Sequence, residues 1–128
     1  MVKLILTLFA TKDVAGMREF YRQVLQMEPR IYGQNSCEFP TPGGSRLFIE
    51  EPTGINEHCP GGLRTEPNPG VLLDFEVDDP DAHYARLSKM GIHFDEPIRT
   101  DDYGHRLFRF RDPDGNLLCF FKLPDKKK

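Results

Sequence analysis

Apolar residues near the start of the chain form a short run from Leu4 to Ala10, which is too short for a helix and favours a β-strand. Apolar residues then recur every three or four positions, which predicts an amphipathic helix that Thr11 or Asp13 caps and Pro29 ends. The helix has one apolar stripe, formed by Val14, Met17, Phe20, Tyr21, Val24, Leu25 and Met27. Three short predicted strands follow, at about Arg30–Gln34, Ser36–Phe39 and Arg46–Glu50.

The same plan occurs a second time after a stretch rich in Gly and Pro, residues 54–70. A strand at Val71–Val77 precedes a helix that Asp78-Asp79-Pro80 caps and Gly91 ends. Three further strands are predicted at about His93–Ile98, His105–Phe110 and Leu117–Leu123. A shift of 66 residues places Leu6 on Leu72, Phe9 on Phe75 and Asp13 on Asp79. The pattern therefore predicts a duplication.

This duplication predicts an α+β fold of two tandem β-α-β-β-β modules within one domain of residues 1–128. Module one spans about 1–54, the linker about 55–69 and module two about 70–124. Two such modules can form a curved mixed sheet with the helices on its outer face, which leaves a concave ligand cleft lined by alternate strand residues. A ferredoxin-like domain with extra strands is the alternative.

The composition of the chain argues against nucleic acid and membranes as binding partners. With 17 basic and 20 acidic residues and a net charge of −3, the chain has no basic excess for nucleic acid. No apolar run approaches the ~20 residues of a membrane span, and the first apolar run reads as a strand rather than a signal peptide. The three cysteines are odd in number and lack metal-site spacing, so we expect neither a disulfide framework nor structural zinc. We therefore expect a cytoplasmic protein with no nucleic-acid or membrane partner.

Three segments carry a family resemblance. The first segment lies near the start of the first module and consists of Lys12-Asp13-Val14 followed by Phe20-Tyr21-Arg22-Gln23-Val24-Leu25. Gln26 comes next, at a position where glycine is common in the family named below. Phe75 to Asp81 opens the second module, and Asp112-Pro113-Asp114-Gly115-Asn116 forms a turn near the end. In this order the segments resemble the vicinal-oxygen-chelate superfamily of glyoxalases, bleomycin-resistance proteins and extradiol dioxygenases. The resemblance covers nearly the whole chain.

The resemblance also implies where a metal would bind, since the metalloenzymes of this superfamily place one His or Glu ligand on each of four strands. The four positions here hold Leu6, Leu72, Cys119, and either Phe48 or Glu50. Leucine has no donor atom, and the four histidines form no HxH or HxxxH pair. We therefore expect no metal and no other cofactor. The resemblance then points to members that sequester drugs in a groove of paired chains, which implies a homodimer and a role in antibiotic resistance.

Strand parity and the resemblance suggest the residues that line the cleft. They are Leu6, Phe39, Phe48, Glu50, Leu72, Asp74, Tyr103, Arg109 and Cys119. Glu50 and Asp74 are either exposed at strand ends or anchors for a cationic or hydroxyl-bearing ligand. Tyr103 either stacks on a ligand or does not, and Phe39 walls the cleft or packs in the core. Arg109 is solvent-exposed, pairs with one of these carboxylates, or meets an anionic ligand.

Three functions are compatible with these residues. The first is a metal-free protein that binds a small molecule, such as an aromatic or antibiotic-like compound. The second is an enzyme of the lyase, isomerase or dioxygenase type, which uses either a metal held through Glu50 or a general base, Glu50 or Asp74. The third is a module that only dimerises. An inert thiol is expected at Cys119, because no base is placed beside it in the sequence.

Overall fold

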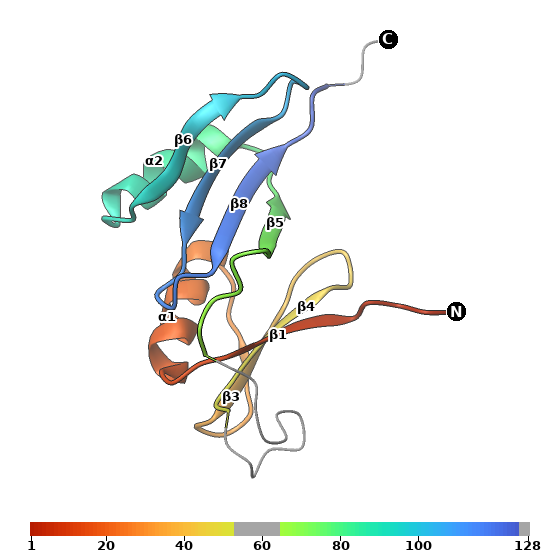
Figure 1. Cartoon of the computed structure of the whole chain (residues 1–128), viewed down its shortest axis with the longest axis vertical. Coiled ribbons are helices and arrows are strands. Elements are labelled where there is room, and N and C mark those ends of the chain that lie inside the picture. The colour runs from red at the N-terminus through yellow and green to blue at the C-terminus, as the bar shows by residue number, and fades with distance from the viewer. Residues whose placement is uncertain (53–64, 126–128) are drawn as a thin grey trace. The chain divides into compact units, whose positions relative to one another are not determined.

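The computed structural model describes residues 1–52 and 65–125. The chain forms two compact units, Met1–Pro67 and Asn68–Lys128, which are called module one and module two below (Figure 1). Their boundary lies in the predicted linker, most of which falls outside the described residues together with His58 and Cys59. Neither helix in the described part of the chain is long and apolar enough to cross a membrane.

Module one contains five elements. They are β1 (Leu6–Ala10), α1 (Val14–Leu25), β2 (Arg30–Ile31), β3 (Ser36–Pro40) and β4 (Arg46–Glu50). The strands form a mixed sheet in the order β1-β4-β3-β2, in which β1 is parallel to β4 and the other pairs are antiparallel. β1 begins two residues later than the pattern predicts, because Leu4 and Ile5 are exposed, and β2 is shorter than predicted.

Helix α1 is capped by a side chain at its start and by a left-handed residue at its end. Asp13 caps its start, where the carboxylate accepts a hydrogen bond of 2.9 Å from the backbone N–H of Gly16. The helix ends at Leu25, since Gln26 adopts the left-handed conformation with φ 52° and donates its N–H to the Arg22 carbonyl. The prediction that Pro29 ends this helix is therefore wrong. Gln26 takes over the terminating role that Gly commonly has.

Module two repeats the topology. Its elements are β5 (Leu72–Glu76), α2 (Pro80–Lys89), β6 (Phe94–Thr100), β7 (Arg106–Arg111) and β8 (Leu117–Lys122). The sheet order is β5-β8-β7-β6, again with the first strand parallel to the last one. The α+β class and the tandem β-α-β-β-β modules are confirmed, and the strands are hydrogen-bonded in two four-stranded mixed sheets, one in each module.

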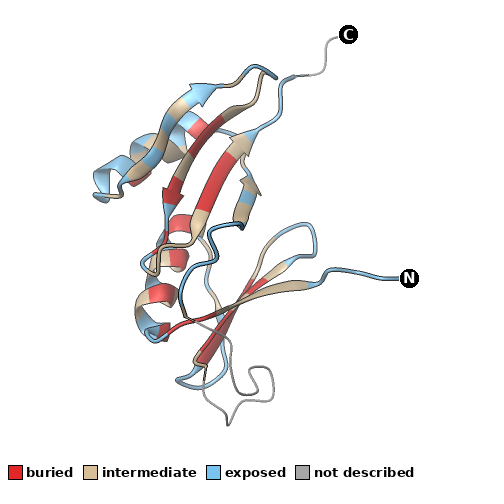
Figure 2. Cartoon of the chain, in the orientation of Figure 1, coloured by how far each residue is buried: buried red, intermediate tan, exposed pale blue. Residues whose placement is uncertain are grey.

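Each helix packs on one face of the sheet in its own module. Buried positions occur on both helices and on strands of both sheets (Figure 2). In module one, α1 packs on β3 and β4, where Tyr21 contacts Phe39 with ring centroids 6.1 Å apart. In module two, Tyr84 of α2 meets the ring of Phe108, which belongs to a cluster of buried phenylalanines. Phe110 and Phe120 complete that cluster, each at most 2% exposed. The opposite side of each sheet is called the helix-free face below.

The turn Asp112–Asn116 joins β7 to β8. The carboxylate of Asp112 accepts backbone N–H bonds from Asp114 and Asn116, at 3.0 and 2.9 Å, and a third bond from the Asn116 side chain. Gly115 has φ +92°, a conformation that side chains with a Cβ rarely adopt. The turn residues therefore fix the register in which Arg109 lies opposite Cys119.

Candidate functional site

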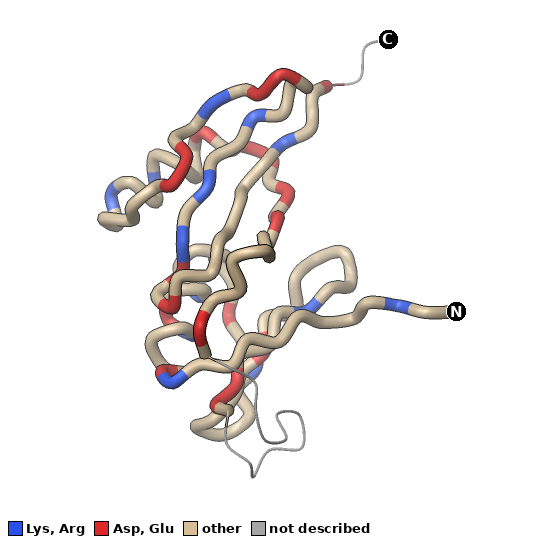
Figure 3. Tube along the Cα trace, in the orientation of Figure 1, with Lys and Arg blue, Asp and Glu red and all other residues tan. Residues whose placement is uncertain are grey.

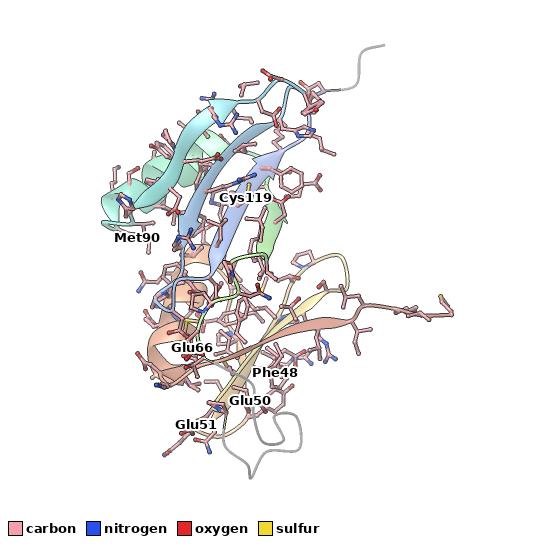
Figure 4. All side chains as sticks on the ribbon, viewed as in Figure 1. Phe48, Glu50, Glu51, Glu66, Met90 and Cys119 are labelled. Carbon is pink, nitrogen blue, oxygen red and sulfur yellow. The ribbon has the colours of Figure 1, made fainter. Side chains whose placement is uncertain are left out.

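The candidate site residues fall into equivalent cross-strand rows on the two helix-free faces. In module one the register places Leu8 beside Phe48, Phe48 beside Glu38 and Glu38 beside Arg30. In module two, residues with the same places in the sheet are Asp74, Cys119, Arg109 and Glu96. Figure 4 shows Phe48 on β4 and Cys119 on β8. Leu6 and Leu72 lie one row further, opposite Arg46 and Leu117.

The row in module one is organised around a buried carboxylate, Glu38, whose side chain is 1% exposed. Its two oxygens are bound by different partners: the Tyr32 hydroxyl at 2.7 Å and the Arg46 Nη1 at 2.9 Å. The Tyr32 ring lies over Phe48, with centroids 5.6 Å apart and planes 11° from parallel. The contact therefore combines an aromatic stack with a charge-assisted hydrogen bond.

These contacts decide the charge of Glu38. Burial alone raises the pKa of a carboxyl group, but here the hydrogen bonds from Tyr32 and Arg46 outweigh it, and the pKa of Glu38 is lowered. The charge of Arg30 acts in the same direction. The pKa of the Tyr32 hydroxyl is raised, mainly because it donates to that carboxylate. Glu38 is thus ionised and Tyr32 neutral at physiological pH.

Two other predicted residues of module one are buried on opposite faces. Phe39 is 0% exposed and packs against α1, which is the core alternative of the two that the sequence left open. Glu50 lies on the helix-free face, two residues beyond Phe48 on β4, and is 2% exposed (Figure 4). Glu50 is therefore not exposed to solvent at the end of its strand, which was one of the two alternatives for this residue.

In module two, Cys119 lies between Asp74 and Arg109. Cys119 is 2% exposed, and burial and a hydrogen bond to Asp74 raise the pKa of its thiol to about 12, against a smaller opposing influence of Arg109. Asp74 itself is exposed, as is Glu76, the next residue of β5 on the same face. The thiol therefore stays protonated and works as a hydrogen-bond donor, not as a nucleophile.

Arg109 forms an ion pair with Glu96 on β6. Its Nε lies 3.4 Å from Oε2 of Glu96, and Oε2 also lies 3.6 Å from Nη2 of Arg99. The Arg109 side chain is 35% exposed, so it keeps access to solvent. Figure 3 shows the basic positions along β7 and the acidic ones along β5. In module two the mostly apolar strand β8 therefore lies between the acidic residues of β5 and Arg109 on β7, whose charge is partly neutralised by Glu96.

Tyr103 lies at the tip of the β6–β7 hairpin and is 82% exposed. Asp101 holds the hairpin by accepting backbone N–H bonds from Tyr103 and His105, both at 2.9 Å. The rings of Tyr103 and His105 are 6.3 Å apart, and His105 is 6.5 Å from Phe121. This short aromatic series leads from the exposed tip to the helix-free face, where Phe121 lies beside Glu76.

The residues at the metal-ligand positions do not fit a metal. Leu6 and Leu72 offer no donor atom, and a thiol with a pKa of about 12, at Cys119, releases its proton poorly. The remaining position is filled by the ring of Phe48, which faces Tyr32, or by Glu50 alone. Within residues 1–52 and 65–125 no group of three or more His, Cys, Asp and Glu side chains is arranged to hold a metal ion.

Sequence reasoning missed four residues of this site: Tyr32, Glu38, Arg46 and Glu96. In the alternation Ser36-Cys37-Glu38-Phe39 the position of Glu38 faces away from Cys37 and Phe39, and nothing in the sequence distinguishes it from an ordinary solvent-facing strand residue. Its burial depends on Tyr32, which reaches over it from the β2–β3 turn. Glu96 meets Arg109 only because β6 shifts register on either side of it, which the sequence does not reveal.

The duplicated β-α-β-β-β topology is the one expected for a chain of the vicinal-oxygen-chelate type. The model of the Glyoxalase/Bleomycin resistance protein/Dioxygenase superfamily matches residues 3–120, so the chain belongs to this superfamily. The chain is 27% identical over 131 residues to the uncharacterized protein YraH of Bacillus subtilis, covering 95% of this chain and 99% of that protein.

Solved structures with the same fold include proteins with different names. A glyoxalase/bleomycin resistance protein from Catenulispora acidiphila has a TM-score of 0.66 and 22% identity, covering 96% of this chain and 100% of that chain. A lactoylglutathione lyase from Agrobacterium tumefaciens has a TM-score of 0.74 and 19% identity, covering 95% and 94%. At such identities the likeness shows the fold alone.

Proposed function

We propose that this chain is a small-molecule-binding protein that holds an aromatic, organic compound without a metal. One observation carries the proposal: the positions expected to hold metal ligands contain two leucines, a protonated thiol and either a stacked phenylalanine or one glutamate, Glu50. These side chains suit contact with an apolar ligand body, and the charged groups beside them suit its polar substituents. Homodimer formation, a cytoplasmic location and a part in antibiotic resistance belong to the same proposal.

The proposal is tested by ligand binding to protein that has been treated with a chelator. A panel of planar aromatic compounds and aromatic antibiotics, bleomycin among them, is screened by thermal shift, and hits are measured by calorimetry. We expect saturable binding that stabilises the fold, that does not change when divalent ions are added, and that returns the compound unaltered. Binding that appears only with a metal, or no binding by any compound, would contradict the proposal.

A second candidate function is a metal-independent enzyme with a carboxylate base, and the burial of Glu50 favours it. A carboxylate shielded from bulk water on the same face as the proposed ligand contacts can accept a proton from a bound molecule. Conversion of a bound compound that Glu50→Gln abolishes, with the fold and the binding retained, would select this function. Retained conversion in Glu50→Gln would exclude Glu50 as the base.

A further inference from the structure

The cluster of Tyr32, Glu38, Arg46 and Phe48 in module one is more than a structural contact. Burying a carboxylate in a sheet face is costly unless each oxygen is satisfied, and a pair of apolar residues would fill the space at lower cost. Here both Glu38 oxygens are engaged, and one of the bonds fixes the ring of Tyr32. The arrangement therefore sets the orientation of an aromatic ring that would otherwise move freely.

The fixed ring is also accessible. Tyr32 is 49% exposed although one of its faces lies over Phe48. A planar ligand can extend the stack of two rings without ordering any new side chain, since the hydroxyl bond to Glu38 already holds Tyr32 in place. Preorganisation of this kind lowers the entropic cost of binding.

The charges beside the stack indicate the sign of the ligand. Two guanidinium groups lie near the stack, Arg30 in the same row and Arg46 in the next one. The carboxylates of Glu38 and Glu50 on this face are both buried, so the accessible charges are the positive ones. Arg46 is 39% exposed, and its bond to Glu38 uses one nitrogen of a group that carries several N–H donors. A carboxylate or phenolate on the ligand can therefore bond Arg46 while the attached ring stacks on Tyr32.

We propose that the Tyr32–Phe48 stack and Arg46 form a binding site for a planar aromatic anion, in which Glu38 is a positioning residue that holds Tyr32 and competes for Arg46. The inference rests on the proposed function and adds a ligand class to it. It also assigns roles to three residues, Tyr32, Glu38 and Arg46, that the strand pattern did not single out.

The probes are 2-naphthoate and the neutral 2-naphthalenemethanol, measured by ligand-observed NMR and calorimetry on the full chain. Tyr32→Leu is expected to lose most of the affinity for both probes. Tyr32→Phe, which keeps the ring but removes the hydroxyl bond to Glu38, is expected to bind both probes several-fold more weakly than the wild type and more tightly than Tyr32→Leu. Arg46→Gln is expected to weaken 2-naphthoate about tenfold, the size of one charge-assisted hydrogen bond, and to leave the alcohol unchanged.

Glu38→Gln separates positioning from mere support of the fold. The amide oxygen still accepts the Tyr32 hydroxyl bond, but the charge that competes for Arg46 is gone, so affinity for 2-naphthoate rises several-fold while affinity for the alcohol stays constant. A residue that only supports the fold would weaken both. Equal weakening in Glu38→Gln therefore overturns its assigned role.

Matched controls lie in module two, where Phe121→Leu changes an aromatic ring of the helix-free face and Arg106→Gln removes a guanidinium that is 37% exposed and paired with Asp81. These variants are expected to bind 2-naphthoate as the wild type does. If the module-two variants lose 2-naphthoate binding and the module-one variants keep it, the proposed site is wrong, but the proposal that the protein binds a small molecule is not contradicted. If compounds of the wider panel bind and 2-naphthoate does not, the ligand class is wrong. If no compound binds, the proposed function fails as well.

Discussion

Glu38 on β3 and Arg109 on β7 occupy the same place in the two modules and carry opposite charges. Each lies directly across from the central residue of its row, Phe48 or Cys119, and each meets an opposite charge from the next strand, Arg30 or Glu96. The duplicated backbone thus places opposite charges on neighbouring strands at this point of each sheet, with the signs exchanged between the modules; in module two the pair forms an ion contact of 3.4 Å. The two helix-free faces therefore differ in their chemistry although their topology is the same.

The charge of Glu38 makes part of the stability depend on pH. Its pKa in the folded protein is lowered from the ordinary value of 4.5, since the bonds from Tyr32 and Arg46 outweigh burial. The stabilisation is therefore complete above about 4.5 and is lost as the pH falls through the folded-state pKa. Thermal unfolding followed from neutral to acidic pH should show a smaller acid loss in Glu38→Gln than in the wild type. Equal slopes would contradict this assignment.

Removal of the carboxylate tests the same contact by another route. Glu38→Ala deprives Arg46 and Tyr32 of their shared acceptor and should lower the free energy of unfolding by about 1–3 kcal/mol, the usual cost of a broken buried hydrogen-bonded contact. Chemical denaturation measures this. The matched control is Glu28→Ala, which removes an exposed carboxylate from a surface ion pair and should change little.

Cys119 should resist alkylation in the folded protein. Burial and the bond to Asp74 raise the pKa of its thiol to about 12, so little thiolate is present at any pH at which the protein is handled. Iodoacetamide labelling followed by peptide mass mapping should show Cys119 modified only after denaturation. Rapid labelling of this residue in the native state would contradict the inert-thiol assignment and revive a nucleophilic role.

The end of α1 offers a stabilising substitution. Gln26 has φ 52°, a conformation that is strained for any residue with a Cβ and free of strain for glycine. Gln26→Gly should therefore raise the free energy of unfolding by about 0.5–1 kcal/mol in spite of the more flexible unfolded chain. Gln26→Ala is the control, since it keeps the Cβ and should bring no gain.

The aromatic cluster under α2 should dominate the stability of module two. Phe110 is 0% exposed and touches Phe108, Phe120 and Phe94, so Phe110→Ala should cost about 3–5 kcal/mol. Phe121→Ala, on the helix-free face and only half-buried, should cost clearly less. Equal losses measured by denaturation would mean that the helix-free face is packed as tightly as the core.

The sequence allowed the fold to be predicted in some detail, because each module contains local signals that agree with one another. The apolar stripe from Val14 to Met27 predicted α1, which ends two residues earlier at Leu25, and the turn containing Gly115 predicted the β7–β8 hairpin. The end of α1 was misjudged, since proline is a recognised helix breaker whereas a left-handed glutamine has no signature in the sequence.

The site was less predictable, because it depends on contacts between strands. Parity placed Leu6 and Phe48 on one face of module one and Cys119 on the equivalent face of module two, and the register within each sheet agrees with this. The burial of Glu38 depends on Tyr32 and Arg46, which are close to it only in the folded sheet. Contacts of this kind can be inferred only when the register of the strands is known. Without the register, a polar residue in a strand is expected to face solvent.

We propose that this member of the superfamily binds its ligand without a metal. The most direct test is elemental analysis of purified, tag-free protein together with thermal shift of the chelator-treated protein on addition of Mn²⁺, Ni²⁺, Zn²⁺ and Fe²⁺. We expect no bound metal and no stabilisation by any of these ions. Near-stoichiometric metal with a clear rise in Tm, abolished by Glu50→Gln, would contradict it and place metal-dependent chemistry first.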